Sequence, residues 1–167
     1  MRAVNFCRYY LLLTRTAETN MLKAALYMTL MTLGVSAAAL GIINIAFDFE
    51  DGPNWMRPVP ILTLFFIVVV LAPALETALL VMFVKVGQYV QLGALTIAAL
   101  FALGMACLHA EDTAHGLIVT LPFFIWTYFY ASTRDQLPDR AWKIIFFSHA
   151  IHNAVIVAMM AAALVFA

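Results

Sequence analysis

The chain has 167 residues, of which 65% are hydrophobic and 11% charged, and its formal net charge at pH 7 is zero. Soluble domains contain about 45–50% apolar and about 25% charged residues, so this composition excludes an ordinary soluble protein and predicts a polytopic membrane protein. A neutral chain gives no indication of nucleic-acid binding. Cys7 and Cys107 lie far apart in the sequence, so neither a disulfide framework nor a CxxC metal motif is present.

Residues 1–20 form the first predicted element. Their apolar core, YYLLL at residues 9–13, is too short for a signal peptide, and Arg15 follows it closely. We expect this segment to be a cytoplasmic or interfacial lead-in, folded as an amphipathic helix on the membrane surface.

The remaining length accommodates about five membrane spans of roughly 20 residues each. The hydropathy pattern places them at residues 21–47, 61–86, 94–110, 117–132 and 142–166. A polar loop with Trp55 as an interface anchor separates the first two spans, and residues 88–93 form a short turn. The sequence therefore predicts an all-α bundle of about five transmembrane helices, forming a single integral membrane domain over residues 1–167.

The positive charges are distributed unevenly over the loops. Eight of the nine Lys and Arg residues fall on one side of the predicted spans, and only Arg57 falls on the other. Cytoplasmic loops carry an excess of Lys and Arg, so we expect the N-terminus to be cytoplasmic and the C-terminus to lie outside.

Four strongly polar residues stand inside apolar spans: Glu76, His109, His149 and Asn153. A charged side chain at the bilayer centre costs about 2.5–3.5 kcal/mol even on insertion scales, so each needs a partner or a function. A structural interpretation is available for each one, because buried carboxyl, imidazole and amide groups also tie membrane helices together. Several such residues on different spans favour a functional site.

Pro73 precedes Glu76 by three residues in the segment LAPALET. A proline at this position removes the hydrogen bond to the carbonyl of Val69 and kinks or opens the helix. We therefore expect Glu76 to face a widened and hydrated point of the bundle.

The last span carries His149, His152 and Asn153 on one helix face, because residues three and four apart are neighbours. A carboxylate and a histidine can activate a water molecule as a general base. A second histidine and an asparagine amide can donate hydrogen bonds to a developing oxyanion. Together these groups suffice to hydrolyse a peptide bond without a serine or cysteine nucleophile.

These residues resemble the motifs of the CPBP (CAAX protease and bacteriocin-processing) family of glutamic-type intramembrane endopeptidases, which includes the CAAX prenyl endopeptidases. The first family motif is a Glu-Glu pair followed by an Arg, usually after Ala-Pro. Here APALETALLV keeps the first Glu as Glu76, while Thr77 replaces the second Glu and Val81 replaces the Arg. The loss of this second Glu and of the Arg removes an ion pair that organises the site in most members.

The other two family motifs follow in the expected order on later spans. The second, Phe-x-x-x-His, corresponds to MACLH, in which Met105 replaces the Phe and His109 is kept. The third, His-x-x-x-Asn or Asp, is matched in full by HAIHN from His149 to Asn153. The resemblance covers roughly residues 60–160, which we take as the protease-like core.

The resemblance implies a membrane-embedded endopeptidase without a metal or other cofactor. Its substrate would be a membrane-anchored or lipid-embedded protein or peptide, such as a C-terminal sorting signal or a CAAX-like tail, and its location a prokaryotic inner membrane. Glu76 and His109 would activate the water, and His149 and Asn153 would hold the oxyanion. The supporting residues would be His152, Thr77 and Pro73.

Other interpretations of the same residues remain open. Glu76, His109 and His149 could ligate zinc as a metalloprotease site, although no HExxH motif is present. The two histidines could instead ligate haem in an electron carrier. The departures from the first motif fit a non-catalytic family member that acts in immunity or as a scaffold. GVSA around Ser36 imitates a rhomboid serine motif, but it stands before the histidines rather than after them.

The depths of the candidate residues disagree on ideal straight helices. Glu76 and His149 fall in the cytoplasmic half, whereas His109 lies near the outer end of its span, an offset of about 10 Å at 1.5 Å per residue. Helix tilt, a break at Pro73 or a later start of the third span would remove the offset. The site would then be a water-filled pocket between the second, third and fifth spans.

Overall fold

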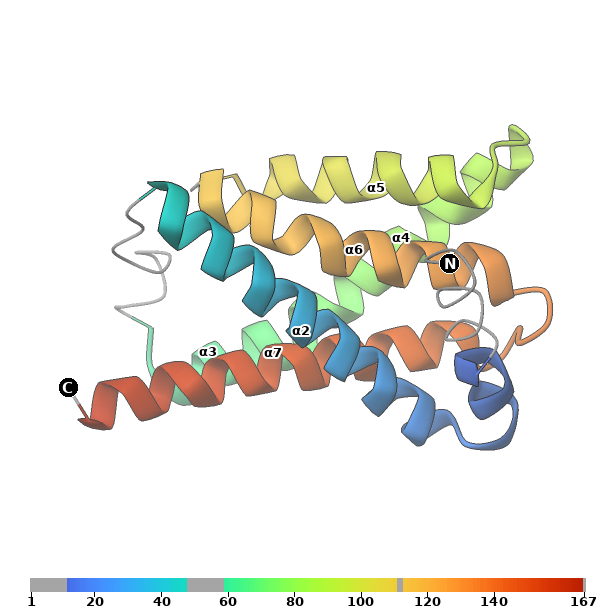
Figure 1. Cartoon of the computed structure of the whole chain (residues 1–167). Coiled ribbons are helices and arrows are strands. Elements are labelled where there is room, and N and C mark those ends of the chain that lie inside the picture. Colours follow the sequence, from blue (N-terminus) through green and yellow to red (C-terminus); the bar gives the residue numbers. More distant parts are fainter. Residues whose placement is uncertain (1–11, 48–58, 111–112, 167) are drawn as a thin grey trace.

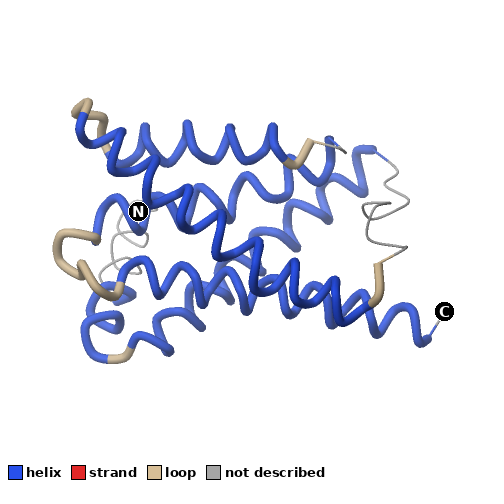
Figure 2. Tube along the Cα trace, turned by 180° about the vertical axis from the view of Figure 1, so that it is seen from behind, coloured by secondary structure: helices blue, strands red, loops and turns tan. Residues whose placement is uncertain are grey.

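The computed structural model describes residues 12–47, 59–110 and 113–166, and it confirms an all-α bundle (Figures 1 and 2). Within these residues there is no strand. The helices are α2 (Met21–Phe47), α3 (Ile61–Phe65), η2 (Phe66–Leu71), α4 (Ala72–Tyr89), α5 (Ala94–Leu108), α6 (Thr113–Thr133) and α7 (Ala141–Phe166). Helices α3, η2 and α4 follow one another without a break and together form the second span.

Four helices in the described part of the chain are long and apolar enough to cross a membrane, which identifies an integral membrane protein. They cover residues 21–43, 61–89, 114–133 and 141–162. The predicted third span is also a helix, but α5 has only 15 residues. At 1.5 Å per residue it is about 22 Å long, whereas the hydrocarbon core is about 30 Å thick.

Most predicted span boundaries lie within a few residues of the observed ones. Helix α2 has the predicted bounds, α4 continues to Tyr89, and α6 begins at Thr113. Part of the lead-in is helical over residues 12–19, while residues 1–11 lie outside the described residues. Asn20 caps α2, because its Oδ1 accepts a hydrogen bond of 2.9 Å from the backbone N–H of Lys23.

The lead-in helix is attached to the start of α7. Arg140 donates from its guanidinium to the carbonyl oxygens of Ala17 and Glu18, at the C-terminal end of that helix. Such carbonyls have no partner within their own helix, and a cation there also complements the helix dipole. Ala17 is fully buried, so one face of the lead-in packs against protein.

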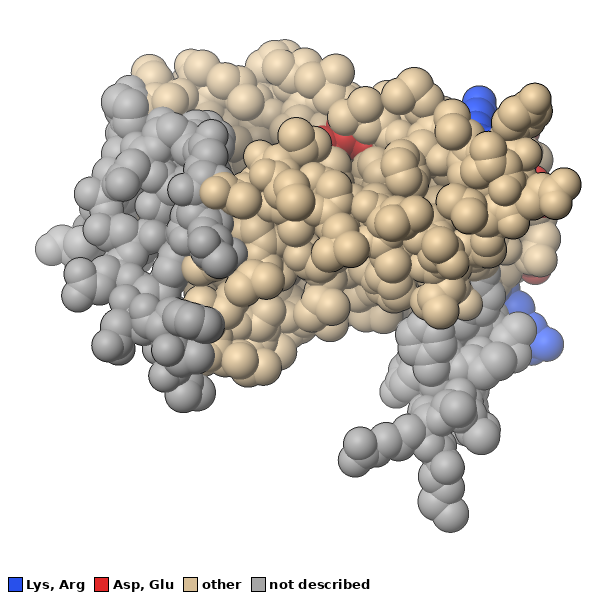
Figure 3. All heavy atoms as spheres, turned by 90° about the horizontal axis from the view of Figure 1, so that it is seen from above, with Lys and Arg blue, Asp and Glu red and all other residues tan. Residues whose placement is uncertain are grey.

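One end of the bundle collects the positive charges. Figure 1 shows that α2 and α7 begin at this end and that α4 and α6 finish there. The Lys and Arg atoms visible in Figure 3 gather at the same end. The positively charged residues of these elements and their loops are Arg15, Lys23, Lys85, Arg134, Arg140 and Lys143.

Helices α5 and α6 approach each other closely at Gly116. A Cβ atom on this residue would lie 2.8 Å from the carbonyl oxygen of Ala106, a distance that real side chains do not adopt. The glycine therefore permits close backbone contact between the two helices. This contact fixes the end of α5, which carries His109, against the first turns of α6.

The turn between α4 and α5 is a Schellman motif. The N–H of Leu92 bonds to the carbonyl of Gly87 and the N–H of Gln91 bonds to that of Gln88, both at 2.9 Å. Gln91 occupies the left-handed position with φ of 62°, where glycine is the usual residue. The turn reverses the chain, so α5 returns along α4.

Candidate functional site

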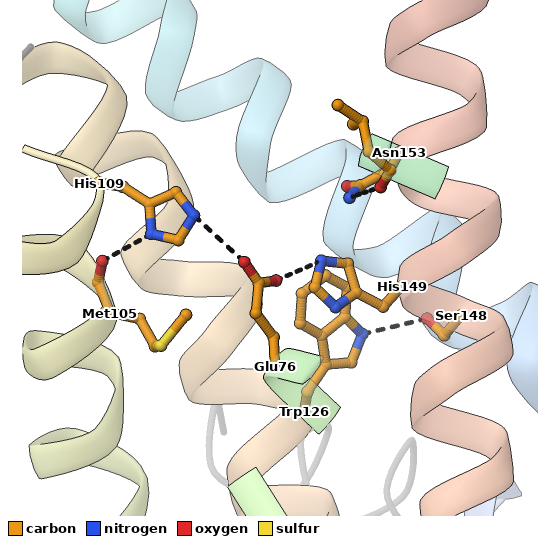
Figure 4. A network of polar contacts seen from close by, with 8 residues as sticks. Glu76, Met105, His109, Trp126, Ser148, His149 and Asn153 are labelled. Atoms are coloured by element: carbon orange, nitrogen blue, oxygen red, sulfur yellow. Dashed lines mark hydrogen bonds and ion pairs between the residues drawn. The ribbon is translucent and has the colours of Figure 1, made fainter. Parts of the chain in front are cut away.

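Glu76 lies between two histidines that come from different helices (Figure 4). Its Oε1 is 3.4 Å from Nε2 of His109, which follows α5, and its Oε2 is 3.2 Å from Nε2 of His149 on α7. Three of the four polar residues predicted for the site are thus brought together. Each carboxylate oxygen contacts one imidazole, so the three groups can exchange protons with one another.

His109 is held by the end of its own helix. It is the residue that follows α5, and its Nδ1 lies 2.8 Å from the carbonyl oxygen of Met105. A carbonyl only accepts, so Nδ1 carries the hydrogen and Nε2 is directed to Glu76. The contact between this Nε2 and the carboxylate then requires a proton on one of the two groups. Such a pair can accept a proton and release it again.

His149 is held by aromatic packing. The Trp126 ring stacks on the His149 imidazole with centroids 4.2 Å apart and an interplanar angle of 28°. Phe123 meets the same imidazole edge-on at 5.5 Å and also lies 5.7 Å from the His109 ring. Both aromatic residues come from α6 and are almost fully buried. Helix α6 therefore supplies the aromatic side chains that pack against the two histidines.

The packing of these aromatic residues against the histidines was not predicted. Phe123 and Trp126 stand in the run FFIWTYFY, which was assigned only to a membrane span. The run is a weak signal by itself, since aromatic residues are common in apolar helices. The contacts of Phe123 and Trp126 with the two histidine rings become recognisable only once α6 is placed beside α5 and α7.

The predicted opening of the helix before Glu76 is present and takes the form of a π-helical segment, η2. The backbone N–H of Ala72 bonds to Ile67, five residues earlier, rather than to Val68. Pro73 has no N–H to offer in its place. The carbonyl of Val68 is consequently left without a backbone donor. Bulges of this kind occur frequently at functional sites.

Asn153 supplies the missing donor. Its Nδ2 donates a hydrogen bond of 2.8 Å to the carbonyl oxygen of Val68. The side chain lies one helical turn beyond His149 on the same helix, α7 (Figure 4). One of its two amide hydrogens is engaged in this contact, which ties α7 to the opened turn of the second span.

His152 points away from the carboxylate. Its Nδ1 lies 2.9 Å from Oγ1 of Thr32 on α2, and that hydroxyl donates to the carbonyl of Thr29. Nδ1 of His152 therefore carries the hydrogen and donates to Thr32. The interaction joins α7 to α2.

A chain of hydroxyl contacts continues behind His149. Nε1 of Trp126 donates to Oγ of Ser148 at 3.1 Å. Oγ1 of Thr29 lies 3.1 Å from the carbonyl oxygen of Ser148 and 3.3 Å from its Oγ. The Trp126 ring, which stacks on His149, is thereby fixed to α2 and α7. These hydroxyl residues were also missed by the sequence interpretation.

Thr77 and Val81, the two departures from the first motif, lie on the side of α4 away from the carboxylate. Both line a cavity of about 950 Å³ between α4, α6, the loop after α6 and α7. The sequence had predicted a pocket in a different place, between the second, third and fifth spans. The residues that line this cavity do not include Glu76, His109 or His149. Pro73 and Thr77 are buried in α4.

The carboxylate is nevertheless accessible. The side chains of Glu76 and His109 are 16% and 23% exposed, whereas that of His149 is 5% exposed. Figure 3 shows a small acidic patch within the otherwise uncharged middle of one face. A reactant can therefore approach Glu76 from the side of His109, while His149 closes the inner side.

The predicted offset in depth is absent, and one reason is that α4 continues to Tyr89, three residues beyond the predicted end of the second span. His109 follows a helix of 15 residues, and its imidazole meets the Glu76 carboxylate directly. A helix of about 22 Å ends before it has crossed the hydrocarbon core. His109 consequently lies at the depth of Glu76 rather than at the far end of the bundle.

The geometry also bears on the other sequence interpretations. Among the described residues, no group of three or more His, Cys, Asp and Glu side chains is arranged to hold a metal ion. Each oxygen of the Glu76 carboxylate contacts one of the two imidazoles that the haem interpretation would use as ligands. Ser36 is buried in α2, and within the described chain its Oγ makes no hydrogen bond.

Comparison of the chain with protein-family models, curated proteins and solved structures finds no match. The resemblance to the CPBP motifs therefore rests on the residues themselves. The geometry of Glu76, His109 and His149 stands independently of that resemblance.

Proposed function

We propose that the protein is a glutamic-type intramembrane endopeptidase of the CPBP kind. The observation that carries the proposal is the Glu76 carboxylate, held between the Nε2 atoms of His109 and His149 inside an apolar bundle. Ionisable residues within membrane spans are rare and are usually functional. Here three of them from separate helices converge, and one side of the cluster is open.

In the proposed reaction Glu76 acts as the general base. It takes a proton from a water molecule on its exposed side, and the hydroxide attacks the carbonyl carbon of the scissile peptide bond. His109 supports this step because its Nε2 lies 3.4 Å from one oxygen of the carboxylate, within reach of a proton passed between the two groups. The same pair then delivers the proton to the amide nitrogen, the C–N bond breaks, and an acid and an amine leave.

His149 and Asn153 are proposed to hold the oxyanion. The stack with Trp126 fixes the His149 ring, so its donor would be oriented before the substrate arrives. Asn153 donates one of its two amide hydrogens to the carbonyl oxygen of Val68. The second amide hydrogen would be available to the oxyanion of the tetrahedral intermediate. The buried surroundings would strengthen both donors, because they exclude bulk water.

The proposed substrate is a membrane-anchored or lipid-embedded protein or peptide, such as a C-terminal sorting signal or a CAAX-like tail. Glu76 lies inside the apolar span of residues 61–89 with 16% of its side chain exposed, which favours a substrate that is itself embedded in or anchored to the membrane. We place the protein in a prokaryotic inner membrane, with a cytoplasmic N-terminus and an external C-terminus. The collection of basic residues at one end supports this orientation.

The test compares peptide termini in cells that carry the wild type, Glu76→Gln or Glu18→Gln. Glu76→Gln preserves shape but removes the base, whereas Glu18 lies in the lead-in helix and serves as the matched control. We expect a new terminus near a membrane segment in the wild type and the control, and its loss in Glu76→Gln. Identical termini in all three cell lines would refute the protease assignment.

A chelator separates this mechanism from a zinc-dependent one. Each imidazole contacts a different carboxylate oxygen, so we expect cleavage by the purified protein to persist after chelation. Loss of cleavage on chelation, with recovery on adding stoichiometric zinc, would replace the general-base mechanism with a metal-dependent one.

A further inference from the structure

The cavity of about 950 Å³ lies apart from the carboxylate site, on the opposite side of α4. Its walls are largely apolar and come from α4 and α7, with Ala74, Ala78, Met82 and Phe146 among them. The three residues from α4 are exposed. In a membrane-spanning helix such a wall faces lipid, so the cavity is open to the bilayer.

The polar end of the cavity is cationic. Lys85 and Arg134 line it from the ends of α4 and α6. Arg134 contacts Asp135 at 3.1 Å, but the carboxylate of Asp135 is 82% exposed. Lys85 is exposed, and no carboxylate of the described residues lies within ion-pair distance of it. The two cations and one carboxylate leave a net positive charge that favours an anion.

Aromatic and charged groups place this end at the membrane interface. Trp142 lines the cavity and is 42% exposed, and Nζ of Lys143 lies 5.5 Å from the centre of its ring. Trp and Lys are typical residues of the headgroup region. The end of the cavity therefore lies at headgroup depth, where the bundle gathers its basic residues.

The inner part of the cavity contains a polar atom without a partner. Thr77 lines the cavity and is 5% exposed, and its Oγ1 makes no hydrogen bond within the described part of the protein. Thr77 and Lys85 are eight residues apart, or about 12 Å along the helix. Thr77 therefore lies about two helical turns inside the cationic end of the cavity.

We propose that this cavity binds one anionic phospholipid. Its phosphate contacts Lys85 and Arg134, and an acyl chain runs along Met82 and Ala78. The Thr77 hydroxyl lies in the inner part of the cavity, where it can donate to an ester oxygen. The proposal concerns a separate site and holds whether or not the carboxylate site cleaves peptides.

The walls favour a lipid over a peptide. The apolar walls from α4 and α7 are helical, so their backbone N–H and C=O groups are already paired, and an extended peptide would find few partners there for its own amides. An unpaired amide in an apolar environment is costly, whereas an acyl chain has no such group to satisfy. The headgroup supplies the negative charge that the mouth of the cavity favours.

The experiment measures lipid retention on the purified full-length protein by native mass spectrometry. The lipids are phosphatidylglycerol and phosphatidylcholine with identical acyl chains. We expect preferential retention of phosphatidylglycerol. Removing two cations that each contribute about 1 kcal/mol should weaken this binding about thirtyfold in Lys85→Gln/Arg134→Gln. Lys23→Gln is the control, since Lys23 lies at the same end of the bundle over the ring of Tyr27.

A second variant keeps the test valid if the double substitution does not fold. Ala78→Phe fills the apolar wall and leaves both cations in place, and we expect it to reduce phosphatidylglycerol retention as well. Equal retention of the two lipids, or unchanged retention in these variants, would overturn the proposal. Equivalent binding of soluble glycerol phosphate, or a peptide crosslinked to a photoreactive group at Met82, would also overturn it.

Discussion

The side-chain amide of Asn153 on α7 donates a 2.8 Å hydrogen bond to the backbone carbonyl of Val68 in η2. This carbonyl has lost its helical donor because Ala72 bonds to Ile67 and Pro73 has no N–H. The proline and the asparagine therefore act as a pair. One opens the helix, and the other compensates for the opening.

A double-mutant cycle tests this pairing. Asn153→Leu leaves the Val68 carbonyl without a donor, which should cost about 1–3 kcal/mol in the free energy of unfolding. Pro73→Ala restores a backbone N–H that can close the helix, so the same Asn153→Leu change should cost clearly less in that background. Unfolding measured in mild detergent gives both values. An equal cost in the two backgrounds would contradict the pairing.

Trp126 is predicted to position His149. Trp126→Phe keeps an aromatic ring but loses the N–H that bonds Ser148, so the stack on His149 should loosen. Losing one hydrogen bond of about 1 kcal/mol should lower kcat roughly tenfold or less. KM should stay nearly unchanged, because substrate binding is not altered.

The control for this prediction is Phe124→Leu. Phe124 stacks on Tyr128, and among the described residues its ring is not paired with that of His109 or His149. Turnover of the substrate identified by its new terminus should be unaffected in this variant. A purely structural role for Trp126 would instead reduce the yield of folded protein and leave kcat of the folded fraction intact.

Gly116 is predicted to be intolerant of a larger side chain. Gly116→Ala places a Cβ against the carbonyl of Ala106 and forces α5 and α6 apart, which should cost about 1–3 kcal/mol. Gly104→Ala is the matched control, since a Cβ there meets no atom within 4 Å. The control should gain up to about 1 kcal/mol, because alanine favours helix over glycine. Equal thermal stability of the two variants would contradict the close approach.

Gln91 carries backbone strain that a single substitution can relieve. Gln91→Gly should raise the free energy of unfolding by up to about 1 kcal/mol, because relief of a left-handed strain of about 1–2 kcal/mol outweighs the roughly 0.4–1 kcal/mol that glycine costs through the unfolded state. Gln91→Ala removes the same side chain but retains the strain, so it should bring no gain. Thermal unfolding of the two variants distinguishes these outcomes, and an equal gain in both would point to the side chain instead.

The polar residues that the structure brings together were easier to predict than their surroundings. Glu76, His109 and His149 could be predicted because ionisable groups are costly in apolar spans. The opening at Pro73 followed from its missing N–H. The contact of Asn153 with Val68 could not be predicted, since it depends on which carbonyl the π-helical turn leaves without a donor.

Other features depend on the way the helices pack. Thr29, Thr32 and Ser148 give no sequence signal, because hydroxyl groups in membrane helices commonly bond to their own backbone. The place of Phe123 and Trp126 under the histidines depends on the short helix α5 and on Gly116. The position of the cavity depends on helix tilts, which hydropathy does not encode.

The length of α5 has a consequence for the bilayer itself. A helix of about 22 Å matches a hydrocarbon layer several ångströms thinner than the average of about 30 Å. Lipids beside α5 must shorten or tilt to meet it, at a cost of a fraction of a kcal/mol per ångström of mismatch. The leaflet nearest His109 should therefore dip beside it, which carries headgroups and their hydration water toward Glu76. A carboxylate in the middle of the bundle thus becomes reachable by water from one leaflet, without a channel through the whole protein.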